Sequence, residues 1–153
     1  MRNLELKIPP LVLMVVVALM MWLAAVAMPL VLITFAGQVA VALILAIAGA
    51  QLAISATRTF YDRQTTVNPL TPDASSTLIT DGVFKLSRNP IYLGMTLMLA
   101  GLAVWFGALT SVLGVPLFVI YMTRLQIIPE ERSLQAQFGE AFSAYCQQTR
   151  RWI

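Results

Sequence analysis

Four apolar segments that contain hardly any charge limit this chain to folds that keep such segments inside a lipid bilayer. They cover residues 11–32, 39–56, 91–106 and 109–128. Hydrophobic residues make up 59% of the 153 positions and charged residues only 11%, which is far from the balance of a soluble domain. A bilayer core of about 30 Å needs about 20 helical residues, so the first and fourth segments can span it and the third is short. The sequence therefore predicts an all-α integral membrane protein with four transmembrane helices.

The placement of the charged residues predicts which side of the membrane each connection occupies. The connections around residues 34–38 and 106–111 carry no charge, whereas both ends of the chain and residues 57–89 do. Because basic residues favour the cytoplasmic side, we expect both ends and residues 57–89 to be cytoplasmic. This arrangement is one membrane domain over residues 1–153, N-in and C-in, in the inner membrane if the source is bacterial. A signal peptide ending near residue 27 is less favoured, because the remainder of the chain would still be a membrane protein rather than a secreted domain.

Two polar segments complete the predicted fold. Residues 57–89 form a cytoplasmic loop that contains the turn signal Asp81-Gly82. Residues 130–148 are predicted to form an amphipathic helix on the membrane surface. Its apolar positions, spaced by four, four and three, are Leu134, Phe138, Phe142 and Tyr145. The second and third apolar segments are rich in Gly and Ala, which predicts close packing of these two helices in lipid.

The residue types that are missing exclude several kinds of active site. The chain has no His and a single Cys, Cys146. The lack of His excludes a Ser-His-Asp or Cys-His nucleophile, an HExxH zinc site and a His proton relay. One Cys forms neither an intrachain disulfide nor a cysteine metal cluster. We expect no metal site and no nucleic-acid partner.

The third apolar segment begins with a helix start that is expected to face the cytoplasm. Asn89 can cap free backbone N–H groups, and Pro90 is tolerated in the first helical turn. The N-terminal end of a helix carries partial positive charge and Arg88 adds a full charge, so an anionic group of a ligand could bind there. The alternative is that Arg88 only anchors the topology and Asn89 only caps the helix.

Three further charged side chains lie near the end of the fourth apolar segment, on the same side. Glu130 and Glu131 could hold a cationic or hydroxyl-bearing group, or could belong to a solvated first turn of the next helix. Arg124 could meet a carboxylate or phosphate of a lipid, or could simply extend to the interface.

Between residues 68 and 153 these motifs together resemble a known group of enzymes. The matching stretches are Gly82-Val83-Phe84, Ser87-Arg88-Asn89-Pro90-Ile91-Tyr92-Leu93-Gly94, Glu130-Glu131-Arg132-Ser133-Leu134, Phe138-Gly139, Tyr145 and Arg151-Trp152-Ile153. They are similar to the C-terminal signature of the isoprenylcysteine carboxyl methyltransferase and phospholipid methyltransferase group. The first two apolar segments match that group only in character.

The resemblance implies a membrane enzyme that uses S-adenosylmethionine, bound on the cytoplasmic side, to methylate a lipid-linked or hydrophobic acceptor, with a carboxylate as the expected acceptor. The residues that it assigns to the cofactor are Ser76, Thr77, Leu78, Ile79, Phe84, Arg88, Asn89, Pro90, Ile91, Tyr92 and Glu130. The carboxylate of the cofactor is expected on the N–H groups after Asn89, near Arg88. Glu130 is then expected to meet the ribose hydroxyls or the amino group, while Phe84 and Tyr92 shield the sulfonium or the adenine.

Two positions depart from the pattern of that group. Asn89 stands where His is usual, and it can still donate and accept hydrogen bonds. Gln126 stands where a basic residue that contacts the substrate is usual, four positions before Glu130. Arg124 is the nearest basic replacement, so Arg124 and Gln126 are the candidate substrate-binding residues.

Two other functions are open on the sequence alone. The membrane sterol reductases, which use NADPH, resemble this chain in the R-x-P-x-Y element but are usually larger. A small non-catalytic membrane protein that packs beside a larger partner is the second alternative. The identity of the methyl acceptor and the oligomeric state are open as well.

Overall fold

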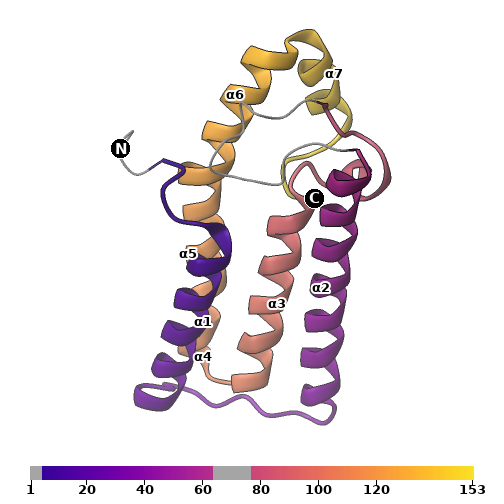
Figure 1. Cartoon of the computed structure of the whole chain (residues 1–153). Coiled ribbons are helices and arrows are strands. Elements are labelled where there is room, and N and C mark those ends of the chain that lie inside the picture. The colour runs from indigo at the N-terminus through magenta and orange to yellow at the C-terminus, as the bar shows by residue number, and fades with distance from the viewer. Residues whose placement is uncertain (1–4, 64–76) are drawn as a thin grey trace.

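The computed structural model describes residues 5–63 and 77–153, and this part of the chain is helical, without a named strand. The longer α-helices are α1 (Pro10–Ala27), α2 (Gln38–Asp62), α3 (Pro90–Phe106), α5 (Gly114–Tyr121), α6 (Ile128–Phe138) and α7 (Glu140–Gln148). The shorter elements are a 3₁₀ turn, η3 (Gly82–Lys85), a single turn, α4 (Leu109–Val112), and a stretch of π-helix, η4 (Met122–Ile127). From α4 to α6 the chain runs as one nearly continuous helix (Figure 1).

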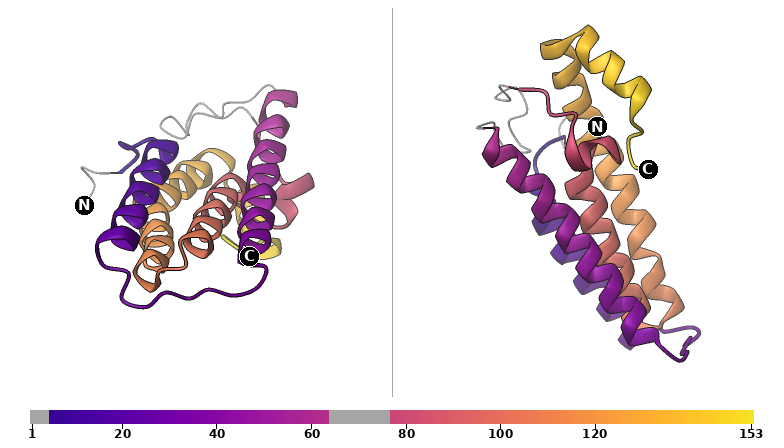
Figure 2. Two further views of the ribbon diagram at one scale, coloured as in Figure 1. Left: turned by 90° about the horizontal axis from the view of Figure 1, so that it is seen from below. Right: turned by 90° about the vertical axis from the view of Figure 1, so that its right-hand side faces the viewer.

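The helices form a bundle with α3 at its centre (Figures 1 and 2). α2 packs on one side of α3, while α1 and α5 pack on the other. Three helices, α1, α2 and Leu109–Phe138, are long and apolar enough to cross a membrane. α3 is apolar but has 17 residues, so it is about 25 Å long. The all-helical membrane class is therefore confirmed, while the crossing by α3 and the sidedness stay predictions.

The first helix is shorter than the sequence pattern predicts, because Pro29 interrupts it. α1 ends at Ala27, where an apolar segment to residue 32 was expected. Proline disfavours helical geometry at the residue before it and lacks an N–H of its own. The chain from residue 28 to residue 36 runs instead along the lower end of the bundle to α2 (Figure 1). There the Ile33 N–H donates to the Gly107 carbonyl at 2.7 Å, which ties this connection to the turn after α3.

Glycines set the very close contact between α2 and α3. Gly49 and Gly94 face one another so closely that a Cβ on either would collide with the backbone of the other. A Cβ on Gly101 would lie 2.8 Å from the carbonyl oxygen of Ala42. Packing, rather than hydrophobicity, drives helix association in lipid, so these contacts hold α2 and α3 together. The close packing predicted for the small residues is confirmed.

A proline follows the π-helical stretch, in the first turn of α6, and the beginning of the described chain supplies the hydrogen bond that this proline cannot make. Pro129 has no N–H to donate to the Leu125 carbonyl four residues before it. The Leu6 N–H donates to that carbonyl instead, at 3.1 Å. An ion pair between Glu5 and Arg132 holds the same segment against α6.

The polar segments differ in detail from the expected loop and surface helix. α2 continues through Asp62, six residues beyond the predicted end of the second span. The predicted helix over residues 130–148 is divided at Gly139, whose φ of +51° suits glycine, into α6 and α7. The apolar face of α7 packs on protein: Phe142 and Tyr145 share a small core with the end of α2 and with η3.

Candidate functional site

The polar end of the bundle, where α3 begins and α6 begins, brings together residues far apart in the sequence (Figure 1). α3 starts there because Pro90 takes the first-turn position, where its missing N–H costs nothing. Beyond α7 the chain returns to this point, so residues 149–152 lie beside the start of α3.

Tyr92 and Glu130 connect the two halves of the predicted site. The Tyr92 hydroxyl donates a hydrogen bond of 2.6 Å to Glu130 Oε1. Gln126 Nε2 donates to the same oxygen at 2.5 Å. Tyr92 and Gln126 are 8% and 2% exposed, so this carboxyl oxygen accepts hydrogen bonds from two buried residues. Such an arrangement fixes the direction of the Glu130 carboxyl, which could accept hydrogen bonds from an amino or hydroxyl group of a ligand.

Glu131, the next residue, lies between two arginines. Its Oε1 accepts from Arg88 Nη2 at 2.7 Å and from Arg151 Nε at 3.1 Å. Its Oε2 accepts from Arg151 Nη2 at 2.6 Å. The hydrogen bond to Glu131 raises the pKa of the Arg151 guanidinium above its usual value. One carboxylate between two guanidinium groups leaves the cluster with a net positive charge.

The start of α3 is bonded to the backbone of residues 149–151, and this corrects the expected role of Asn89. The Asn89 side chain makes no capping bond; its Nδ2 donates to the Arg151 carbonyl at 3.0 Å. Arg88 Nη1 donates to the Thr149 carbonyl at 2.6 Å, and the Arg88 N–H donates to the Arg150 carbonyl at 3.0 Å. Arg88 is thus more than a topology anchor, since it is paired within the protein.

Phe84 and the predicted residues before it belong to a neighbouring apolar cluster. Phe84 is buried against Phe60, and its carbonyl accepts a 2.7 Å hydrogen bond from the Tyr145 hydroxyl. Burial raises the pKa of that hydroxyl above its usual range, so Tyr145 stays a neutral donor. Ile79 and Leu78 pack in the same cluster, and Ile91 contacts both this cluster and the larger core around Tyr92. The apolar predicted residues of these clusters thus occupy two adjoining groups that Ile91 joins.

The remaining predicted residues lie in different surroundings. Thr77 is exposed, and Ser76 lies outside the described residues. Gln126 is buried beside Glu130, whereas Arg124, two residues earlier, is exposed. The two candidate substrate-binding residues are therefore not brought together. Within residues 5–63 and 77–153, no cluster of acidic and cysteine side chains could hold a metal ion.

Sequence reasoning missed the part that residues 149–152 play. Arg151 and Trp152 entered only as part of a motif, yet Arg151 binds Glu131 through both Nε and Nη2. The Trp152 indole N–H donates to Thr123 Oγ1, within the π-helical stretch, at 3.1 Å. A basic residue beside a tryptophan was the available signal, but its partners could be found only in the fold.

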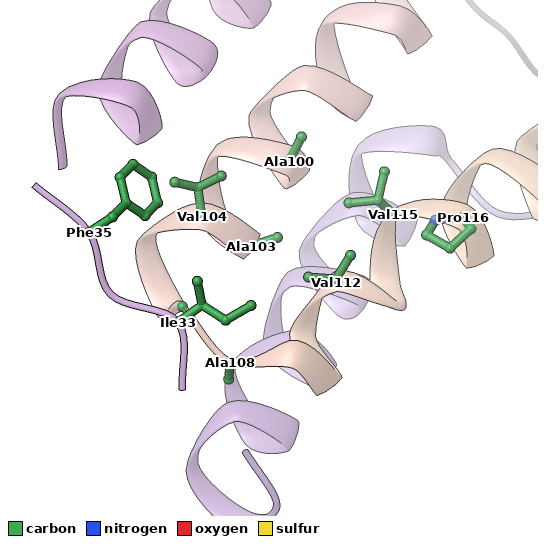
Figure 3. A pocket seen from close by; sticks show the side chains of 10 residues that line it. Ile33, Phe35, Ala100, Ala103, Val104, Ala108, Val112, Val115 and Pro116 are labelled. Atoms are coloured by element: carbon green, nitrogen blue, oxygen red, sulfur yellow. The ribbon is translucent and has the colours of Figure 1, made fainter. Parts of the chain in front are cut away.

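An apolar pocket lies at the opposite end of the bundle, between the connection after α1 and the helices α3 and α5 (Figure 3). Its volume is about 380 Å³. The lining residues are Ile33, Phe35, Ala100, Ala103, Val104, Gly107, Ala108, Val112, Val115 and Pro116. None of them is charged, so this pocket suits hydrocarbon and offers nothing to a polar cofactor.

Three of the helices are long and apolar enough for a membrane protein. The candidate site lies at one end of the bundle, which is rich in arginine and glutamate. The family model of the phospholipid methyltransferases matches residues 37–141. This match covers more than half of the chain, and the chain therefore belongs to the phospholipid methyltransferase family. Membership supports a methyltransferase activity, and methyltransferases of this family generally use S-adenosylmethionine.

One relative and the solved structures complete these comparisons. A protein of Haemophilus influenzae (strain ATCC 51907 / DSM 11121 / KW20 / Rd), described as an uncharacterized protein, is 35% identical over 63 residues. The match covers 41% of this chain and all of that protein. No solved structure matches the chain.

Proposed function

We propose that this chain is an integral membrane methyltransferase that transfers a methyl group from S-adenosylmethionine to a lipid-linked or hydrophobic acceptor. The preferred acceptor is a carboxylate, as in isoprenylcysteine carboxyl methylation. The observation that carries the proposal is the hydrogen bond between Tyr92 and Glu130. It joins two of the stretches on which the resemblance rests, although 37 residues lie between Tyr92 and Glu130 in the sequence.

The cofactor site consists of the residues predicted from the sequence around this bond. Glu130 receives the amino group or the ribose hydroxyls of the cofactor, and Tyr92 orients Glu130 while its ring faces the ligand. The start of α3 and Arg88 receive the carboxylate of the cofactor. Arg88 Nε supports this role, because it is buried and is without a hydrogen-bond partner in the described part of the chain. A buried N–H group without a partner is costly, and a bound carboxylate would satisfy it.

The chemistry makes small demands on the protein. S-adenosylmethionine supplies a methyl group on a sulfonium, which leaves as a neutral thioether when the carboxylate oxygen attacks the methyl carbon. An ionised carboxylate needs no base, so a chain without His can support the reaction. Positioning and exclusion of water then account for the catalysis. Exposed Arg124 is proposed to meet the anionic group of the acceptor at the interface, and Gln126 to act through Glu130.

The arrangement in the membrane is that of the predicted topology. Four crossings, with the shorter helix α3 as one of them, place both chain ends and the candidate site on the cytoplasmic side. The water-soluble cofactor then reaches the site from the cytoplasm, while the acceptor reaches it from the bilayer. In a bacterium this places the protein in the inner membrane.

The direct test is ligand binding to detergent-solubilised protein. S-adenosylhomocysteine, the product left after transfer, is expected to bind by calorimetry, and NADPH is expected not to bind. Membranes that contain the protein, incubated with methyl-labelled cofactor, should then yield a labelled hydrophobic product, which mass spectrometry identifies. Binding of NADPH alone would favour a reductase, and binding of neither ligand would favour a non-catalytic role.

A further inference from the structure

The segment from Thr149 to Trp152, which we term the strap, is bonded along its length to both helices of the candidate site. Three of its carbonyl groups accept hydrogen bonds from the residues that precede α3. The donors are Arg88 Nη1 to Thr149, the Arg88 N–H to Arg150, and Ser87 Oγ and Asn89 Nδ2 to Arg151. The side chains of the strap reach the other helix, since Arg151 binds Glu131 and the Trp152 indole binds Thr123.

These bonds lie on both sides of the contact between Tyr92 and Glu130. On one side, the strap holds Arg88 and Asn89, which come one helical turn before Tyr92. On the other side, it holds Glu131, which is adjacent to Glu130. The Arg88 and Glu131 side chains are 12% and 17% exposed, so their ion pair is largely shielded from water and from salt. Beside the direct bonds from Arg88 to Glu131 and from Tyr92 to Glu130, the strap is thus a further tie between the start of α3 and the start of α6.

We infer that the strap is a positioning device, in which Arg151 and Glu131 hold α3 and α6 at the separation that cofactor binding requires. The inference rests on the proposed function. Arg151 acts through Glu131 and touches no reacting atom, so it is a positioning residue. Cofactor affinity therefore depends on a segment outside the predicted binding residues.

Thermodynamic linkage makes the inference testable beyond a loss of activity. If order in the strap raises the affinity for the cofactor, bound cofactor must stabilise the strap by the same factor. The Arg88 amide reports this directly, because its hydrogen bond to the Arg150 carbonyl protects it from exchange. Bound S-adenosylhomocysteine should therefore slow hydrogen exchange at Arg88.

The experiment compares Arg151→Gln, Arg151→Lys and the control Arg132→Gln in the full chain. Arg132 lies next to Glu131 but pairs with Glu5 on an exposed face of α6, so its loss removes an ion pair without touching the strap. We expect Arg151→Gln to weaken S-adenosylhomocysteine binding about ten-fold and the control to change it less than about two-fold. The affinity of Arg151→Lys should lie between those of the other two variants, because Lys keeps the charge but cannot form a bidentate pair with a carboxylate.

A second variant tests the strap independently, in case Arg151→Gln fails to fold. Trp152→Phe keeps an aromatic ring but removes the donor to Thr123, and it should weaken binding in the same direction. Wild-type affinity in both Arg151→Gln and Trp152→Phe, with no slowing of exchange at Arg88, would overturn the strap and leave the proposed function standing. Wild-type protein that binds no S-adenosylhomocysteine would overturn both.

Discussion

At the scale of single residues, Glu130 and Glu131 show how adjacent identical side chains take different roles. A helix turns by about 100° per residue, so consecutive side chains point to different partners. Glu130 meets the neutral donors Tyr92 and Gln126, whereas Glu131 meets two arginines. Glu131 is therefore paired with basic side chains. The Glu130 carboxyl is oriented by Tyr92 and Gln126, and neither of these two donors carries a positive charge.

This difference predicts the outcome of changing Glu130 and Tyr92. Glu130→Gln should weaken S-adenosylhomocysteine binding by up to about ten-fold, because the amide keeps only one of the two acceptor oxygens and a hydrogen bond contributes about 0.5–1.5 kcal/mol. Tyr92→Phe should have a smaller effect in the same direction, since it removes only the hydroxyl that orients Glu130. Calorimetry on solubilised protein measures both affinities, with Arg132→Gln as the control. Unchanged affinity in both variants would remove Glu130 and Tyr92 from the site.

The sequence indicated these two residues but not the hydrogen bonds that Arg88 and Asn89 make nearby. Glu130 and Tyr92 were predicted because motifs name residue types at fixed spacing along the chain. The bonds from Asn89 to the Arg151 carbonyl and from Arg88 to the Thr149 carbonyl involve backbone acceptors. Every residue carries such an acceptor, so no residue type marks it in the sequence. Asn89 was accordingly predicted as a helix cap, a role that the structure does not give it.

At the scale of elements, α2 and α3 depend on glycine at their contact. Gly94→Ala should destabilise the protein by about 1–3 kcal/mol, because the added Cβ meets the Gly49 backbone and forces the helices apart. The matched control is Ala48→Val, which adds volume on an exposed face of α2. Thermal unfolding in detergent measures both changes. A Gly94→Ala protein as stable as the control would show that the helices do not approach so closely.

Element boundaries were predicted well where proline or glycine marks the end of a helix. The start of α3 at Pro90 and its end at Phe106 agree with the predicted segment, because proline and glycine mark both ends. The division at Gly139 was missed, since the apolar spacing of residues 134–145 continues across it. The spacing shows only which side chains are apolar. A turn at Gly139 leaves that spacing unchanged, so the pattern cannot reveal it.

At the scale of the whole molecule, the single cysteine provides a test of the predicted topology. Cys146 on α7 should be reached by an impermeant maleimide only after cells are permeabilised. A thiol introduced by Thr34→Cys in a Cys146→Ser background should be labelled in intact cells. Burial raises the pKa of the Cys146 thiol, so its labelling should quicken as the pH rises through the alkaline range. Labelling of Cys146 in intact cells would contradict the predicted topology and place α7 outside the cytoplasm.

The class of the molecule was the most predictable level of all. Apolar length and the absence of charge specify membrane helices without any knowledge of their partners. The arrangement of those helices around α3 depends on contacts such as Gly49 with Gly94, which join distant parts of the chain.

The hydrogen bond from Leu6 to the Leu125 carbonyl has a consequence for biosynthesis. A chain is made from its N-terminus at about 5–20 residues per second, so Leu6 is made several seconds before Leu125. The segment around Leu6 therefore has no bond to this carbonyl until the π-helical stretch has been made. The strap is made later still, after α6 and α7. A chain made only as far as α7 therefore lacks the bonds that the strap makes to Arg88 and Glu131.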